Sequence, residues 1–448
     1  MRQYAEANRQ RFLDELFTLL RIPSISPDPA RKTDMRKCAE YLVRLLKEAG
    51  AENASVYETE GNPVVFGSRM CDPAASTVLV YGHYDVMPVD PLSEWKSDPF
   101  EPEIRKDAIY ARGASDDKGQ IFMHIKVFEY LVRTGQLKCN VKFIFEGEEE
   151  VGSHSLSKWI TSHRKLLSCD LMLVSDTTMV SEKIPSINCG MRGITYMEVR
   201  VKGPGKDLHS GHYGGAVVNP LNALCKMVAS LIDEDGHITV KGFYDDVVEL
   251  DRKDRKMLAR APYSASEFKE RIGVNGLSGE KGYSTLERIG IRPCLDVNGI
   301  WGGYIAEGSK TVIPSEAHAK ISMRLVPDQD PMTIASLFAS HFKSIAPKGI
   351  SVEVKTLQGG DGFLIPISSR AYRAASKAIE EAYGIEPVPT RGGGSISILA
   401  RMQRVLKADP LLMGFGYERD FAHSPNESLL MDQFFRGMEA IYLFYKYY

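Results

Sequence analysis

Histidine and carboxylate side chains follow several of the most apolar segments of this sequence, and the first such group is His83 with Asp85. The run TVLVYG at 77–82 is apolar throughout, as a buried central strand would be, and His83 comes directly after it. Open α/β sheets bind their ligands beyond the carboxyl ends of such strands. A histidine there can bind metal while a nearby carboxylate holds its other ring nitrogen. A loop histidine beside a solvated aspartate is the alternative.

A second group lies ahead of a predicted helix, where Gly113 and Gly119 enclose Asp116, Asp117 and Lys118. Two aspartates at the start of a helix can simply cap it and interact favourably with its dipole. That interpretation is sufficient for the segment in isolation. A pair of metal ions, however, needs a bridging carboxylate, and this loop offers one.

The segment IFEGEEEVGS places three consecutive glutamates, 148–150, directly after another strand-like run. A run of charge is usually a solvated face, but like charges crowded at the end of a core strand need compensation. A cation among them therefore explains the segment better. Glu149 and Glu150 would point to different sides, so that one can bind metal and the other can transfer protons.

Two more candidates come later in the chain. Asp176 ends the strand-like run DLMLVSD, and His423 lies in a loop rich in turn-forming residues, FGYERDFAHSPNES. The segments together supply two histidines and several carboxylates at the ends of sheet strands. Nitrogen and oxygen ligands without thiolate suit zinc, and also manganese or cobalt, better than they suit a structural zinc-finger site.

The elements that must position these residues alternate between two periodicities. Strand-like runs occupy 63–67, 77–82, 141–147 and 170–176. Helical spacing of apolar residues covers 4–20, 33–49 and 120–135. The alternation predicts an α/β domain with a mostly parallel sheet flanked by helices.

From about residue 189 the pattern changes to alternating apolar and polar residues, as in half-exposed strands. Strand and helix patterns follow in pairs, 194–203 with 219–233 and 317–327 with 331–346. We therefore expect an inserted α+β domain at 189–358, between catalytic segments 1–188 and 359–448. The charged stretch 240–300 is expected to be an irregular elaboration of the insert.

The composition is that of an ordinary globular enzyme. The chain has 448 residues, 43% of them hydrophobic, and a net charge of −2, which indicates neither nucleic acid nor a membrane surface as partner. The seven cysteines are scattered without a C-x-x-C pair, which favours free thiols in a reducing compartment. The first residues lack the apolar core of a signal peptide, so we expect a cytoplasmic protein.

In this order the motifs GHYDVMP, GASDDKG, EGEEEVGS, VSD and AHSPNE resemble those of the co-catalytic zinc metallopeptidases, which include aminoacylases, carboxypeptidase G, carnosinases and cytosolic nonspecific dipeptidases. The resemblance implies two divalent cations per subunit, Zn²⁺ first and Mn²⁺ or Co²⁺ as alternatives. The implied ligands are His83, Asp116 and Asp176 for one cation, and Asp116, Glu150 and His423 for the other. Glu149 would be the general base, and Asp85 would orient His83.

Further segments resemble the carnosinase and cytosolic dipeptidase branch. The resemblance implies a homodimer formed through a lid and dimerisation domain, in which His209 of DLHSGHYGG reaches the partner's active site and stabilises the oxyanion. Arg324 and Ser395 match positions that bind the substrate carboxylate, whereas Gly392 stands where many relatives carry Glu. A cis peptide bond between Asp116 and Asp117 is also implied.

The sequence therefore predicts a two-metal hydrolase that cleaves the peptide bond of dipeptides or other short peptides. An N-acyl amino-acid amidohydrolase with the same metal site is the nearest alternative. A metal-free binding protein that keeps only the fold would lack some of the ligands, and every expected ligand position is filled.

Overall fold

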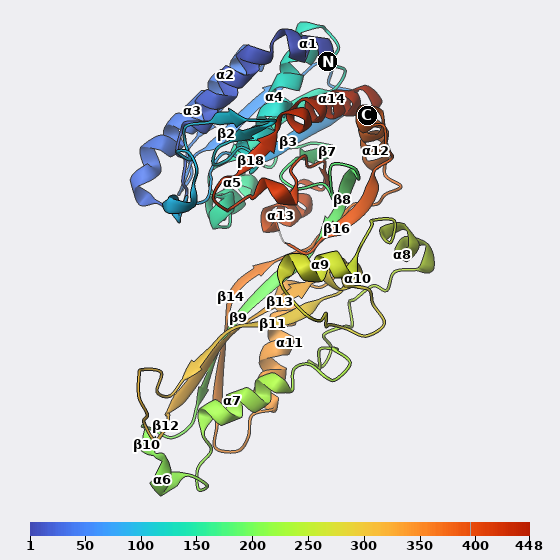
Figure 1. Ribbon diagram of the computed structural model, residues 1–448. Coiled ribbons are helices and arrows are strands. Elements are labelled where there is room, and N and C mark those ends of the chain that lie inside the picture. Colours follow the sequence, from blue (N-terminus) through green and yellow to red (C-terminus); the bar gives the residue numbers. More distant parts are fainter. Residues whose placement is uncertain (395) are drawn as a thin grey trace. The chain divides into compact units, whose positions relative to one another are not determined.

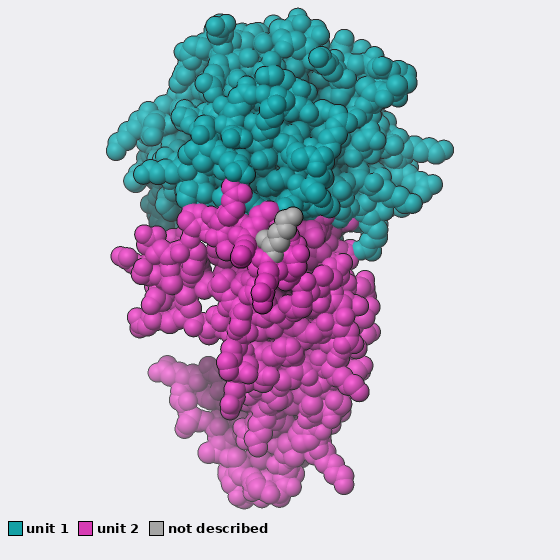
Figure 2. Space-filling view, turned by 90° about the vertical axis from the view of Figure 1, so that its right-hand side faces the viewer, with its two compact units in different colours: residues 1–189, 365–390, 401–448 teal, residues 190–364, 391–400 magenta. Residues whose placement is uncertain are grey.

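The computed structural model describes residues 1–394 and 396–448, and these form two compact units. Unit 1 comprises 1–189, 365–390 and 401–448, and unit 2 comprises 190–364 and 391–400 (Figure 2). Both termini belong to unit 1 (Figure 1). Unit 2 is thus an insertion into the chain of unit 1.

Unit 1 is an α/β structure. Its helices are α1 (Arg2–Ala7), α2 (Arg9–Leu20), α3 (Lys32–Ala49), α4 (Lys118–Arg133), α5 (His154–Ser162), α12 (Arg370–Tyr383) and α14 (Met431–Tyr447). Its strands are β1 (Ser55–Tyr57), β2 (Val64–Arg69), β3 (Thr77–His83), β4 (Glu103–Arg105), β5 (Ala108–Tyr110), β6 (Asn140–Glu146), β7 (Leu171–Val174), β17 (Asp409–Leu412) and β18 (Ser428–Leu430). Three elements cross the unit boundaries: β8 (Ser186–Met191), β16 (Val388–Gly392) and α13 (Ser397–Leu406).

The central sheet of unit 1 follows the order β1-β2-β6-β3-β7-β17-β8. Strand β3 pairs in parallel with β6 and β7, and β17 pairs in parallel with β7, whereas β1 and β2 pair antiparallel. Because β3, β6 and β7 are parallel, their carboxyl ends lie together, and so do the loops that follow them. The predicted fold class is confirmed.

Helices of unit 1 begin and end where the sequence provides a local reason. The predicted helix 4–20 is interrupted at Asn8, whose backbone is not helical, and it therefore forms two helices, α1 and α2. Helix α3 ends at Gly50 with a φ of 107°, where a Cβ would lie 2.7 Å from Val132 Cγ1. Glycine is required there both for the left-handed backbone and for the close approach of α4.

Unit 2 is built on a four-stranded antiparallel sheet in the order β11-β13-β9-β14. Its strands are β9 (Gly193–Lys202), β10 (Leu208–His209), β11 (Cys294–Gly302), β12 (Val312–Ile313), β13 (Glu316–Leu325), β14 (Ser351–Gly360) and β15 (Phe363–Leu364). Its helices are α6 (Ser210–Tyr213), α7 (Pro220–Ala229), α8 (Arg252–Leu258), α9 (Ala265–Ile272), α10 (Thr285–Gly290) and α11 (Pro331–Ser344). Burial alternates strictly along β9, and its buried residues pack beneath α7 and α11 (Figure 1).

The stretch 240–300 is more regular than expected, because it contains α8, α9 and α10. The side chains of Asp251, Ser264 and Ser284 cap these helices by accepting a backbone N–H three residues on. Ser284 and Glu287 form a complete capping box. The capping signals were present in the sequence but were obscured by its high charge. None of the described helices is both long and apolar enough to cross a membrane.

A buried ion cluster joins the N-terminal helices to α4. The carboxylate of Glu129 accepts hydrogen bonds from Tyr4 Oη at 2.6 Å, Arg11 Nη2 at 2.5 Å and Lys126 Nζ at 3.0 Å. Burial alone would raise the pKa of Glu129, but the hydrogen bond from Arg11 and the charge of Lys126 lower it to about 2. The folded state is therefore stabilised by this carboxylate in its ionised form.

We predict that Glu129→Gln lowers the free energy of unfolding of the EDTA-treated protein by about 3 kcal/mol near neutral pH, because Arg11 and the buried Lys126 both lose the Glu129 carboxylate and keep only Glu15 as counter-charge. Because the folded pKa of Glu129 is depressed, this stabilisation is present above pH 4.5 and lost as the pH falls toward 2. Urea unfolding measured across this range tests the prediction. Glu6→Gln, in the exposed Arg9–Glu6 pair, is the control with little effect. A difference in free energy of unfolding between wild type and Glu129→Gln that does not change with pH would contradict the prediction.

Candidate metal centre

Five side chains that could bind metal gather at the carboxyl edge of the unit 1 sheet. His83 ends β3, Glu150 lies in the turn after β6, and Asp176 lies two residues beyond β7. Asp116 comes from the loop before α4, and His423 comes from the loop before β18. They form two groups, His83 with Asp116 and Asp176, and Asp116 with Glu150 and His423, whose potential ligand atoms lie within 4.8 Å of one another.

Asp116 is shared by the two groups, and each of its oxygens faces a different imidazole. Its Oδ1 lies 3.0 Å from His83 Nε2, and its Oδ2 lies 2.9 Å from His423 Nε2. Asp176 Oδ2 lies 3.8 Å from His83 Nε2, and Glu150 Oε2 lies 3.1 Å from His423 Nε2. Such a carboxylate can bridge two cations. The peptide bond between Asp116 and Asp117 is cis, as the resemblance implied.

Asp85 has more contacts than an orienting partner for His83 requires. His83 Nδ1 lies 3.0 Å from the backbone oxygen of Asp85 and 3.4 Å from its Oδ1. A carbonyl oxygen only accepts, so Nδ1 carries a proton and Nε2 faces the other ligands. The Asp85 carboxylate also accepts the backbone N–H groups of Glu149 and Glu150, each at 3.2 Å. It therefore connects the β3 loop to the glutamate turn.

Burial and like charge raise the proton affinity of the glutamates. Burial raises the pKa of Glu149 well above its usual range, and the negative charge of Asp176 adds to the shift. Burial also raises the pKa of Glu150. One oxygen of Glu150, Oε1, is buried without a hydrogen-bond partner. Positive charge placed among these groups would relieve the repulsion and satisfy this oxygen.

The imidazoles are held by the same carboxylates. Burial opposes protonation of His83, but hydrogen bonds to Asp116 and Asp176 raise its pKa well above the usual value. Hydrogen bonds to Asp116 and Glu150 raise the pKa of His423 to about 10. The ring nitrogens thus face the carboxylates across the space that a divalent cation would take, and a cation would compete there with protons. The donor set and the unsatisfied oxygen fit a pair of divalent cations.

The remaining acidic residues of the EGEEE segment have structural partners. Glu148 accepts the backbone N–H of Asn62 at 2.8 Å and that of Ser155 at 2.9 Å, which anchors the start of α5. Glu146 is buried and accepts hydrogen bonds from Tyr81 Oη at 2.8 Å and Ser153 Oγ at 2.9 Å. The sequence singled out Glu149 and Glu150 but did not indicate the hydrogen-bond partners of Glu146 and Glu148.

Sequence reasoning gave no part in the site to two residues behind the ligands. Asp117 is fully buried, and its Oδ2 accepts the backbone N–H of His83 at 3.2 Å. A Cβ on Gly82 would lie 2.5 Å from that oxygen and 2.2 Å from Ile121 Cγ2, so only glycine fits at this position. Glu427, in the AHSPNE motif, is fully buried beside the Asp116 loop. The signal for it was its place four residues after His423.

The other predicted site residues belong to unit 2. His209 is exposed; its Nδ1 accepts the N–H of Gly211 at 3.0 Å and its ring stacks on that of His212 with centroids 4.6 Å apart. Arg324 lies half-buried on β13, and Gly392 ends β16. Ser395 lies outside the described residues.

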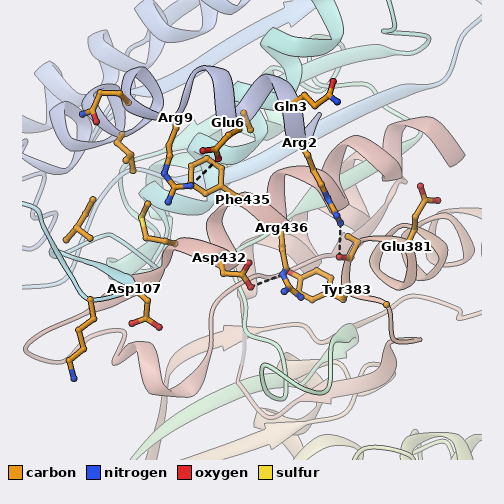
Figure 3. A pocket seen from close by; sticks show the side chains of 18 residues that line it. Arg2, Gln3, Glu6, Arg9, Asp107, Glu381, Tyr383, Asp432, Phe435 and Arg436 are labelled. Atoms are coloured by element: carbon orange, nitrogen blue, oxygen red, sulfur yellow. Dashed lines mark hydrogen bonds and ion pairs between the residues drawn. The ribbon is translucent and has the colours of Figure 1, made fainter.

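A hollow of about 1170 Å³ in unit 1 contains none of the five candidate ligands. It is lined by α1, α2, the β4–β5 hairpin, the end of α12 and the start of α14 (Figure 3). Its charges are largely paired, with Arg9 3.3 Å from Glu6 and Arg436 2.7 Å from Asp432.

An α/β unit with paired carboxylate and imidazole groups at the carboxyl ends of its strands, interrupted by an α+β unit, fits a metal-dependent hydrolase. The chain belongs to peptidase family M20/M25/M40, whose family model matches residues 79–447. The family predicted from the motifs is confirmed, and with it the prediction of a hydrolase.

Similar proteins of known identity match nearly the whole chain. The Cys-Gly metallodipeptidase dug1 of Schizosaccharomyces pombe is 31% identical over 97% of this chain and 94% of its own length. The structure of an M20 family metallo-carboxypeptidase from Sulfolobus solfataricus matches with a TM-score of 0.85 at 31% identity, covering 97% of this chain and 98% of that one. Human carnosine dipeptidase 1 matches with a TM-score of 0.80 at 28% identity, covering 99% and 97%.

We predict that Asp116→Asn abolishes stable uptake of both cations, because both ligand groups include its carboxylate. Asp176→Asn should lower the affinity for only one cation, since Asp176 belongs to one ligand group. The measurement is metal content per chain after equilibrium dialysis against Zn²⁺ or Mn²⁺. Glu148→Gln, which alters the neighbouring structural glutamate, is the matched control and should retain both cations. Two cations bound to Asp116→Asn would contradict the shared-ligand arrangement.

Proposed function

We propose that this protein hydrolyses the peptide bond of dipeptides and other short peptides with a pair of divalent cations, zinc before manganese or cobalt. The observation that supports this most strongly is Asp116, whose two oxygens face two separate histidine-containing groups. The relatives named as dipeptidases match almost the full chain, which supports the same substrate class.

The ligands of one cation would be His83, Asp116 and Asp176, and those of the other Asp116, Glu150 and His423. When bound, such a pair lowers the pKa of a water molecule toward about 7 and polarises the scissile carbonyl group. All five side chains come from one unit, so the pair can be held without a contribution from unit 2.

Glu149 is the proposed general base. It is outside both ligand groups, yet it interacts with Asp176, His83 and Glu150. Its backbone is held by Asp85, which fixes the position of the turn. Burial raises the pKa of Glu149, which suits a group that first takes a proton from water and then gives it to the leaving amine.

We assign substrate recognition and oxyanion stabilisation to unit 2. Arg324 would bind the free carboxylate of a short peptide as a fork, together with Ser395. His209, which is exposed on unit 2, would act in the site of a second subunit. In this assignment 189–358 is the lid and dimerisation domain, and 1–188 with 359–448 is the catalytic domain.

A homodimer formed through unit 2 is supported by its edge strand. Strand β11 is at the edge of the sheet and exposes the apolar side chains of Val297, Ile300 and Trp301. An exposed apolar edge strand readily pairs with another chain. The seven free cysteines suit a reducing compartment, and we propose a cytoplasmic location.

We predict that the wild type, loaded with Zn²⁺ or Mn²⁺, cleaves a panel of dipeptides and that Glu149→Gln lowers kcat by about 10²–10⁴-fold, because the general base is removed. KM and the metal content should remain close to those of the wild type. Cleavage of N-acetyl or N-succinyl amino acids in place of dipeptides would assign the protein to the amidohydrolases instead.

We predict that His209→Ala lowers kcat by about two to three decades, as the loss of one oxyanion donor does. If His209 acts across the dimer, mixing inactive His209→Ala with inactive Glu149→Gln should restore activity, because in each mixed dimer one site has both intact residues. Random exchange of subunits in a C₂ dimer makes that about a quarter of all sites. No recovery after confirmed subunit exchange would place His209 in its own chain's site.

A further inference from the structure

Glu427 is a buried carboxylate whose hydrogen bonds all go to one loop. Its Oε2 accepts Arg112 Nη1 at 2.7 Å and the N–H of Gly113 at 2.9 Å. Its Oε1 accepts the N–H of Ser115 at 2.9 Å and that of Asp116 at 3.0 Å. The side chain is completely inaccessible to solvent.

These bonds hold the backbone of the bridging residue itself. The N–H of Asp116 fixes the peptide plane that precedes its side chain, and the bond to Gly113 fixes the other end of the same loop. The charge of Glu427 is balanced by Arg112, which is also buried and donates to the backbone oxygen of Pro88 at 3.0 Å. Both oxygens of the Glu427 carboxylate accept two hydrogen bonds each, and a charge-assisted arrangement of this kind restricts the loop to one conformation.

The same segment carries His423. Strand β18 pairs antiparallel with β5, so the loop that leaves β5 and the loop that enters β18 run side by side. The backbone oxygen of Glu427 accepts the N–H of Ala111 at 3.2 Å. The preceding residue, Asn426, also anchors this segment. Its Oδ1 accepts the backbone N–H of Lys96 at 2.9 Å, and its Nδ2 donates to the backbone oxygen of Glu94 at 2.8 Å.

We propose that Glu427 is a positioning residue that sets the place of the Asp116 carboxylate between His83 and His423 by holding the 112–116 backbone. The inference rests on the proposed two-cation function. Because Asp116 belongs to both ligand groups, displacement of its loop would lower the affinity for both cations. If Glu427 acted only through its own loop, which also carries His423, its loss would lower the affinity for the cation bound by His423 alone.

The test variant is Glu427→Gln. Glutamine has nearly the same size, but one acceptor oxygen becomes an NH₂ donor. In either orientation of the amide, this NH₂ group would face two N–H donors, those at Oε2 or those at Oε1. We expect both cation affinities to fall by about 10–100-fold, measured by equilibrium dialysis of Mn²⁺ into the metal-free protein. In the metal-free protein, hydrogen exchange at the amides of Gly113, Ser115 and Asp116 should become faster.

The matched control is Glu280→Gln in unit 2. Glu280 is also a buried carboxylate, paired with Arg292 at 2.6 and 2.7 Å, and its loss should lower Tm without changing either cation affinity. If Glu427→Gln does not fold, Arg112→Lys serves instead. It leaves both bonds to Oε1 in place and should cause a smaller fall in both affinities.

The outcomes separate the explanations. A fall in one affinity only, or a fall in Tm with both affinities unchanged, would overturn the positioning role. A wild type that binds no cation would overturn the proposed function. In that case the amide exchange of the metal-free variant still decides the inference, since faster exchange at 113–116 supports the role and unchanged exchange refutes it.

Discussion

The structure of unit 1 depends on keeping several like-charged carboxylates together where little water reaches them. Asp85 and Asp117 are fully buried, and Asp116, Glu149 and Glu150 lie beside them at the same sheet edge. Such a cluster is unfavourable unless positive charge lies within it. The parallel strands bring the groups together, while backbone N–H groups hold the carboxylates of Asp85 and Asp117. A sheet edge preorganised in this way is prepared for cations before they arrive.

The sequence predicted the catalytic sheet well because its strands are buried on both faces. Runs such as TVLVYG have no amphipathic alternative, and β3 spans the predicted strand and one residue more. The α/β class followed from these runs, and the family followed from the spacing of the motifs. The charged stretch 240–300 was harder, since short capped helices such as α9 and α10 bury few apolar side chains.

The candidate site shows where local sequence information ends. His83 and Asp176 could be proposed because each follows an apolar strand, and that signal is local. The partners of Glu427 lie more than 300 positions earlier in the chain, so nothing near it indicated its bonds. The structural role of Glu148 was equally hidden, because its partners Asn62 and Ser155 are tertiary contacts.

Gly82 has a consequence for how this centre can change over time. Any side chain at that position would collide with Asp117 and Ile121, one on the loop beside the ligands and one on α4. Strand and helix are therefore pressed together directly behind His83. Natural variation or directed evolution must leave this residue untouched, and new substrate preferences have to arise elsewhere, on surfaces that do not share this crowding.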